Sequence, residues 1–221
     1  KHIAVSLLLA LAAGTAFAVF DNHRRSDWTP YVYRTDDYGK SWRSLATPQL
    51  RGYALAIVQD PVDPELLFLG TEFGLWVSLD GGRGWTRWSN GFPTVSVMDL
   101  AIHPRDNDLI VATHGRALWV IDDIAPLRGL GAKGLAEKLR LFPVADAGQY
   151  WQPAEDGGFG FGATEFRGTS RPYGAAVTFL ANMNGMVGGL AALALAGFGI
   201  TSLPRGATGT ALAQLALAGA C

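Results

Sequence analysis

Three carboxylates on or beside predicted loops are the candidates for acid–base chemistry: Asp21, Glu72 and Asp99. Hydrolysis of a glycosidic bond uses two carboxyl groups held a defined distance apart, one as the acid and the other as base or nucleophile. The sequence supplies enough carboxylates for such a pair, but it does not fix the distances between them. Hydrolysis of the glycosidase type is therefore one hypothesis, and no residue is assigned a catalytic role.

The same loops carry side chains suited to holding a ligand. Arginine makes bidentate contacts with carboxylates, and aromatic faces suit sugar rings. This mixture predicts a carbohydrate, or another ligand with anionic groups. The alternative for the two histidines is that they only tie their own loops together. The ligand-binding candidates are His23, Arg24, Arg51, Tyr53, His114 and Arg116.

Composition narrows the chemistry further. The formal net charge of -1 gives no basic excess for nucleic acid. Cys221 is the single cysteine, so the chain can form neither an internal disulfide nor a cysteine-based metal site. The histidines show no metal-ligand spacing. We therefore predict no metal, no cofactor and no nucleic-acid partner.

An internal repeat indicates the elements that position these loops. Residues 35–42 and 78–85 both read S/T-x-D-x-G-x-x-W, and Asp80 follows Asp37 by 43 residues. A further shift of the same length reaches Asp123, where the motif loses its Gly and Trp. A period of roughly 40–45 residues with several short strands per unit is typical of propeller blades.

Each motif is predicted to be a structural turn between the third and fourth strand of a blade. The Asp side chain can accept hydrogen bonds from backbone N–H groups of the turn. The Gly supplies a backbone conformation that costs other residues more, and the Trp packs on the sheet. The residues with this role are Asp37, Gly39, Trp42, Asp80, Gly82 and Trp85.

The fold class that follows is all-β, a partial β-propeller of about three four-stranded blades. Turn formers such as Asp60-Pro61 and Gly81-Gly82 separate the β-prone segments. In such blades the loops with the candidate residues lie at the end of the sheets opposite the repeated turns. The expected domains are residues 1–46, 47–91 and 92–130 for three blades, the last degenerate, then an irregular exit segment at 131–182 and an Ala/Gly/Leu-rich tail at 183–221.

These motifs together resemble the large bacterial Asp-box proteins, also described as BNR-repeat glycosyl hydrolase-like or sortilin-like proteins. The resemblance covers residues 14–180, and its most specific parts are Asp21-Asn22-His23-Arg24-Arg25, Gly70-Thr71-Glu72-Phe73-Gly74-Leu75, Thr113-His114-Gly115-Arg116 and Pro126-Leu127-Arg128.

The resemblance implies the final blades of a many-bladed propeller in a long, secreted or periplasmic chain. It implies carbohydrate as ligand, or a peptide if the protein is an interaction module of the sortilin kind. The remaining blades of the longer chain are then partners of this one. A structural or assembly factor without a small ligand is a third hypothesis. No catalytic residue is carried over from the family.

Both ends of the chain leave alternatives open. Residues 3–20 are uncharged and suit either a signal-like segment, over residues 1–18, or two buried strands. The repeat favours the strands, because it needs them in the first blade. After Arg171 only Arg205 is charged. The tail is then a translation artefact such as a frameshift, a weak transmembrane helix or a soluble Ala-rich helix, and only the second implies a membrane.

Overall fold

The structure is a computed structural model, and it describes residues 5–9, 14–135, 137, 139–144, 146, 175–181 and 201–202. The chain divides into two compact units, Lys1–Ala136 and Glu137–Cys221. Most of the expected exit segment and nearly all of the expected tail lie outside the described residues.

The first unit is built from three antiparallel sheets whose strands follow one another in chain order. Sheet 1 contains β1 (Val5–Leu9), β2 (Ala16–Phe20), β3 (Tyr31–Thr35) and β4 (Arg43–Ser44). Sheet 2 contains β5 (Ala54–Gln59), β6 (Leu67–Thr71), β7 (Gly74–Ser78) and β8 (Thr86–Trp88). Sheet 3 contains β9 (Val97–Ile102), β10 (Leu109–Thr113) and β11 (Leu118–Ile121).

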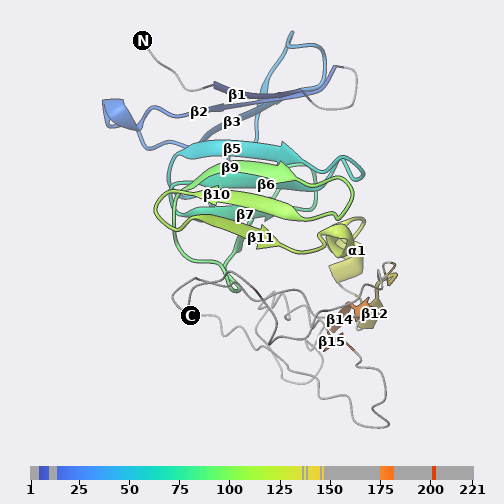
Figure 1. Cartoon of the computed structure of the whole chain (residues 1–221). Coiled ribbons are helices and arrows are strands. Elements are labelled where there is room, and N and C mark those ends of the chain that lie inside the picture. The colour runs from blue at the N-terminus through green and yellow to red at the C-terminus, as the bar shows by residue number, and fades with distance from the viewer. Residues whose placement is uncertain are drawn as a thin grey trace, which may run out of the picture. The chain divides into compact units, whose positions relative to one another are not determined.

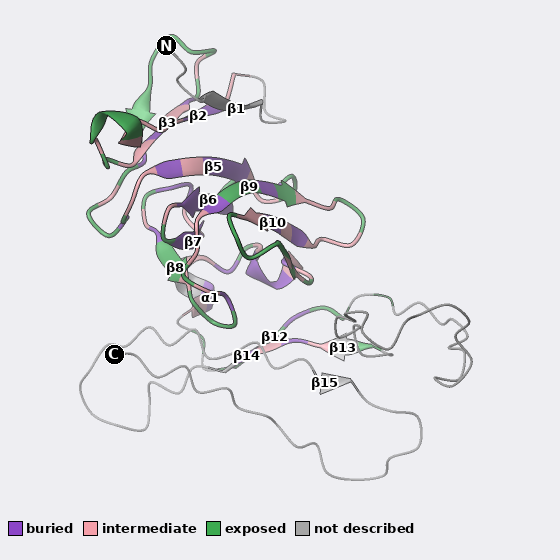
Figure 2. Cartoon of the chain, turned by 60° about the vertical axis from the view of Figure 1, so that its left-hand side comes forward, coloured by how far each residue is buried: buried purple, intermediate pink, exposed green. Residues whose placement is uncertain are grey.

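Sheet 2 is the buried sheet of this unit. Every residue of β6 and β7 is buried, and Figure 2 colours both strands purple. Their continuous apolar character is that of strands covered on both faces. Sheets 1 and 3 supply the two covers, since β1 and β2 lie against β5, and β9 lies against β5 and β6 (Figure 1).

A single apolar core joins sheets 1 and 2. Sheet 1 contributes aliphatic and phenyl side chains, and sheet 2 contributes leucines and two tryptophans. The buried members are Phe17, Val19, Val32, Leu45, Leu50, Ala54, Ile57, Leu67, Leu69, Trp76 and Trp85. Consecutive four-stranded meanders that pack face to face, first strand beside first strand, define a partial β-propeller. The prediction of an all-β propeller fragment is therefore confirmed.

Two details of sheets 1 and 3 bear on the sequence analysis. The segment that could have been signal-like contains β1 and β2, which pair from Val5↔Phe20 to Leu9↔Ala16. Sheet 3, the blade expected to be degenerate, has three strands within the described residues. Where the other units have their repeated turn, Pro126 begins no hairpin and lies in the 3₁₀ helix η2 (Ala125–Leu127). Proline lacks the N–H that strand pairing requires.

The chain after η2 forms few elements. The short helix α1 (Gly131–Leu135) closes the first unit. Within the second unit, β12 (Leu139–Leu141) pairs with β14 (Phe179–Ala181), and β13 (Ala176–Val177) pairs with β15 (Thr201–Ser202). Among the described residues, no helix has the length and apolar character needed to cross a membrane.

Candidate functional site

The loop between β2 and β3 is the distinctive feature of the propeller fragment. It spans residues 21–30, whereas Glu72 and Phe73 alone connect the matching strands β6 and β7. The longer loop contains the 3₁₀ helix η1 (His23–Arg25), which ends at Ser26 in the left-handed conformation. Blade 1 therefore places extra polar and aromatic side chains at the end of the sheets opposite the repeated turns.

Within this loop, Asp21 fixes the orientation of His23. The carboxylate oxygens of Asp21 lie 2.6 and 2.7 Å from Nδ1 of His23, and Oδ1 also accepts the backbone N–H of His23 at 2.9 Å. A carboxylate only accepts hydrogen bonds, so the proton of the pair lies on Nδ1. No described contact uses the other ring nitrogen, Nε2.

Two further aromatic rings, those of Trp28 and Tyr53, lie close to the His23 ring of this pair. The His23 ring stacks on Tyr53 of the next blade with the centroids 4.5 Å apart and an interplanar angle of 18°. The Trp28 ring lies 6.2 Å from His23 and 5.9 Å from Tyr53, and Trp28 is 54% exposed. We call Asp21, His23, Trp28 and Tyr53 the aromatic cluster. It joins the long loop of blade 1 to the entrance of blade 2.

The rest of the loop is held by Asp27. Its carboxylate accepts hydrogen bonds from Asn22 at 2.8 Å, from the Tyr31 hydroxyl at 2.7 Å and from the backbone N–H of Thr29 at 3.1 Å. These bonds, led by that from Asn22, hold the pKa of Asp27 far below its ordinary value. The hydrogen bond that Tyr31 donates to Asp27 raises the pKa of the Tyr31 hydroxyl. Asp27 therefore stays ionised and fixes the loop that presents Trp28.

Two of the candidate carboxylates, Asp21 and Glu72, affect the Tyr53 hydroxyl. Burial raises the pKa of the Tyr53 hydroxyl, and the negative charges of Glu72 and Asp21 raise it further. Glu72 is held there because its backbone N–H donates to the Tyr53 carbonyl at 3.1 Å. A Cβ at Gly52 would lie only 2.9 Å from Cβ of Glu72, so the chain passes close beneath this side chain. Asp21 and Glu72 thus both act on the charge of the Tyr53 hydroxyl.

A line of hydrogen bonds connects the cluster with the loops of blades 2 and 3. Ser96 donates its hydroxyl to the Glu72 carbonyl at 3.0 Å, and the His114 N–H donates to the Ser96 carbonyl at 2.9 Å. The backbone of His114 therefore lies at the same end of the sheets as Tyr53. Its side chain is exposed and makes no described contact with the cluster.

The other candidates lie around or away from the cluster. Arg24 belongs to η1 and Arg51 precedes Tyr53, and both are exposed without a carboxylate partner among the described residues. Arg116 is also exposed, and its carbonyl accepts the Trp119 indole N–H at 2.9 Å. Asp99 lies on β9 and accepts the Leu100 N–H at 2.9 Å. No described contact brings Asp99 to Tyr53.

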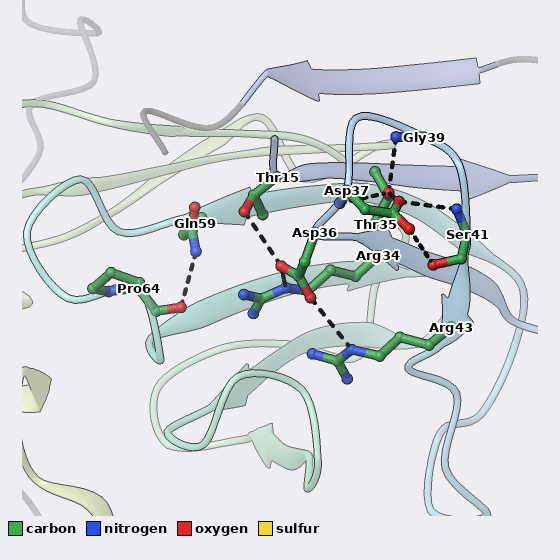
Figure 3. A network of polar contacts seen from close by, with 10 residues as sticks. All are labelled: Thr15, Arg34, Thr35, Asp36, Asp37, Gly39, Ser41, Arg43, Gln59 and Pro64. Atoms are coloured by element: carbon green, nitrogen blue, oxygen red, sulfur yellow. Dashed lines mark hydrogen bonds and ion pairs between the residues drawn. The ribbon is translucent and has the colours of Figure 1, made fainter. Parts of the chain in front are cut away.

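The first repeated turn connects β3 and β4, at the end of sheet 1 opposite the long loop. Figure 3 shows the polar contacts of its side chains. The Asp37 carboxylate accepts the backbone N–H of Ser41 at 2.9 Å, its hydroxyl at 2.6 Å and the Thr35 hydroxyl at 2.8 Å. Thr35 in turn accepts the N–H of Gly39 at 2.9 Å. These bonds, with that from Ser41 first, lower the pKa of Asp37 to about 2. The Asp37 carboxylate is therefore used within the turn itself.

The second turn has the same pattern and an additional contact between blades. Asp80 accepts the Ser78 hydroxyl at 2.8 Å and the Gly84 N–H at 2.9 Å. The indole N–H of Trp85 donates to the Leu45 carbonyl of blade 1 at 2.9 Å. A Cβ at Gly82 would lie 2.8 Å from Cδ1 of Leu45, which leaves no room for a side chain.

One member of the aromatic cluster, and two residues that hold its loop, were not among the candidates from the sequence. Trp28 was not a candidate, nor were Asn22 and Asp27, which fix the loop around it. Their signal in the sequence is the length of the segment between β2 and β3, which breaks the otherwise regular spacing of the repeat. Among the described residues, no group of three His, Cys, Asp or Glu side chains is placed to hold a metal ion.

The fold and this site define an all-β protein of consecutive propeller blades with a polar, aromatic loop at one end. No family model matches the sequence, and no curated protein matches it. One solved structure that it resembles is a GH74 enzyme of Niastella koreensis, at 21% sequence identity and a TM-score of 0.46. That match covers 54% of this chain and 21% of the enzyme, so the chain spans about a fifth of the enzyme's length.

Proposed function

We propose that the chain is the ligand-binding part of an Asp-box propeller and that the aromatic cluster binds carbohydrate. The observation that carries the proposal is the half-exposed Trp28 beside the stacked His23 and Tyr53 rings. Sugar rings pack their C–H faces on such surfaces, and their hydroxyl groups need hydrogen-bond partners at the edge. Asp21, Glu72 and Nε2 of His23 are partners of this kind.

The order of the cluster supports binding without a large rearrangement. Asp21 holds His23, Asp27 holds the loop, and Tyr53 is fixed to Glu72 through its carbonyl. A ligand that meets side chains already in place loses less conformational entropy on binding. Trp28 is 54% exposed, and its open face is the surface available to a sugar.

Titration of the chain with cellohexaose and with hexagalacturonate, followed by calorimetry, tests this proposal. We expect binding of at least one of them, weakened about tenfold by Trp28→Ala, since loss of an aromatic contact of this kind costs about 1.5 kcal/mol. Tyr38→Ala is the matched control, because Tyr38 is an exposed aromatic residue at the other end of sheet 1. Equal losses in both variants, or no binding of either sugar, would contradict the proposal.

Hydrolysis is tested in the same samples. Binding alone predicts no release of reducing sugar from either oligosaccharide during long incubation. A release that Glu72→Gln abolishes would replace the binding proposal with a glycoside hydrolase in which Glu72 and Asp21 are the carboxylates. The release of reducing sugar distinguishes hydrolysis from binding, whatever the affinity for the oligosaccharide.

A peptide ligand is the second candidate, and the exposed arginines favour it. Arg24, Arg25 and Arg51 flank the cluster in the chain without carboxylate partners among the described residues. Guanidinium groups bind a terminal carboxylate strongly. A peptide that binds with a free C-terminus, and loses that binding when amidated or in Arg51→Gln, would support this alternative. The secreted or periplasmic location proposed with either ligand is tested by fractionation of the source cells.

A further inference from the structure

Phe73 is an exposed aromatic residue at the same end of the sheets as the aromatic cluster. It lies in the two-residue connection between β6 and β7 and is 44% exposed. Sheets 1 and 3 already cover the two faces of sheet 2, and Phe73 lies at the end of that sheet. The packing of blades on sheet 2 thus leaves this ring open, and the proposed function does not use it.

The Phe73 ring adjoins the aromatic cluster through Gly52. This glycine directly precedes Tyr53 and has a φ of +74°, and a Cβ on it would lie 2.9 Å from Cδ2 of Phe73. The backbone N–H of Glu72, the residue before Phe73, donates to the Tyr53 carbonyl at 3.1 Å. Tyr53 itself stacks on His23. The cluster and Phe73 therefore form one surface across the loops of blades 1 and 2.

Hydrogen bonds hold the backbone on both sides of this ring. The N–H of Phe73 donates to the Thr71 hydroxyl at 3.3 Å, and its carbonyl accepts the Arg87 guanidinium at 3.0 Å. The Thr71 hydroxyl also accepts the indole N–H of Trp76 at 3.1 Å. A ligand that packs on Phe73 therefore meets a backbone already fixed, which lowers the conformational entropy lost on binding.

Charged groups accompany the Phe73 ring. Oε2 of Glu72 would lie 3.2 Å from the same Cβ position on Gly52, and the exposed Arg51 precedes that glycine in the chain. Arg116, also exposed, occupies the position one repeat after Phe73. An aromatic face with hydrogen-bonding groups beside it suits the C–H face and the hydroxyl groups of a sugar ring.

We propose that Phe73 forms a second sugar subsite and that the ligand is an oligosaccharide whose chain crosses from the long loop of blade 1 to the β6–β7 turn of blade 2. This inference rests on the proposed function, since it extends the same surface by one ring. Packed sheets lie about 10 Å apart, so a chain that reaches both loops contains more than one sugar ring. Phe73 therefore determines how binding depends on the length of the sugar chain.

The experiment compares a short and a long sugar of each series by calorimetry: cellobiose with cellohexaose, and digalacturonate with hexagalacturonate. We expect the hexasaccharide of a series that binds to bind the wild-type chain more than tenfold more tightly than the disaccharide. Phe73→Ala should lower this ratio of affinities about tenfold, because one aromatic contact is lost. A hexasaccharide also gains from its larger number of binding registers, but that gain is the same in both proteins.

Two further variants complete the test. Phe73→Trp keeps an aromatic ring and should retain the wild-type ratio, as should Tyr38→Ala, which removes an exposed ring at the repeated turn. Phe73→Gln replaces Phe73→Ala if circular dichroism shows that the latter is misfolded. A ratio that Phe73→Ala leaves unchanged, while Trp28→Ala weakens the binding of both sugars, would overturn the second subsite and leave the proposed function intact. Absence of binding by all four sugars would overturn both.

Discussion

At the scale of single residues, the charge of Asp37 couples the first repeated turn to pH. Its pKa is lowered to about 2, against about 3.9 for an unperturbed Asp. A carboxylate with a depressed pKa stabilises the folded state above its unfolded pKa, and the contribution disappears as the pH falls through the folded value. Asp37→Asn keeps an oxygen acceptor and removes the ionisation.

We therefore expect Asp37→Asn to be less stable than wild type at neutral pH, with the difference decreasing below about pH 4 and disappearing as the pH falls below about 2. Urea unfolding midpoints at several pH values, followed by tryptophan fluorescence, measure the difference. If the difference stays constant over this range, the pH-dependent part of the stability does not come from Asp37.

The candidate site shows why the sequence predicts which residues suit a ligand but not which of them lie close together. Asp21, His23, Tyr53 and Glu72 were selected because polar and aromatic side chains on loops suit ligands, and the structure brings them together. Asp99 had the same chemistry but lies on β9 without a described contact to them. Trp28 was missed, because its position depends on how Asp27 and Asn22 fold the long loop. That fold leaves no local periodicity to detect.

At the scale of elements, the two repeated turns differ in what they support. Trp85 is buried between blades and bonded to Leu45, whereas Trp42 faces outward. Trp85→Phe keeps an aromatic ring but leaves the Leu45 carbonyl without its donor, and an unsatisfied buried polar group costs about 1–3 kcal/mol. Trp42→Phe is the matched change at the exposed turn and should stay within about 0.5 kcal/mol of wild type.

Urea unfolding at neutral pH and low protein concentration compares the two variants. Low concentration keeps any association of copies out of the measurement. If both variants lose the same stability, the Trp85–Leu45 bond contributes nothing beyond the ring itself.

Strands were the easiest elements to predict. In the third unit the β-prone segments between turn formers are the strands β9, β10 and β11. Alternating or fully apolar runs between Asp, Gly and Pro turn formers specify such strands locally. The third unit departs from the repeat at Pro126. The sequence shows that the motif is degenerate there, but it does not predict that a 3₁₀ helix replaces the hairpin. That outcome depends on contacts with another blade.

At the scale of the whole molecule, a buried ion pair joins the segment after sheet 3 to the end of β5. Arg128 follows η2, and its guanidinium contacts both carboxylate oxygens of Asp60, at the end of β5, at 2.9–3.1 Å. The Asp60 side chain is fully buried, and that of Arg128 is 17% exposed. Ile124, Leu127 and Leu130 are buried beside this link. The segment after sheet 3 thus links blade 3 to blade 2 through the Arg128–Asp60 pair, and it takes the place of the third repeated turn.

Arg128→Gln should therefore destabilise the chain strongly, because it leaves the buried Asp60 carboxylate without its counter-charge. Breaking a buried pair costs about 3–5 kcal/mol, and we expect the lower end, since Val62 and Asp63 still donate their N–H groups to Asp60. Arg105→Gln breaks an exposed pair with Asp106 and should cost less than about 1 kcal/mol.

The double variant Asp60→Asn with Arg128→Gln separates charge from packing. Removal of both charges should restore part of the stability lost in Arg128→Gln, because a neutral amide is much less costly to bury than an unpaired carboxylate. Chemical unfolding of the four proteins gives these differences directly. A double variant less stable than Arg128→Gln would mean that Asp60 acts mainly by accepting N–H groups of its own loop. The two blades would then be held together by the apolar contact of Leu127 and its neighbours.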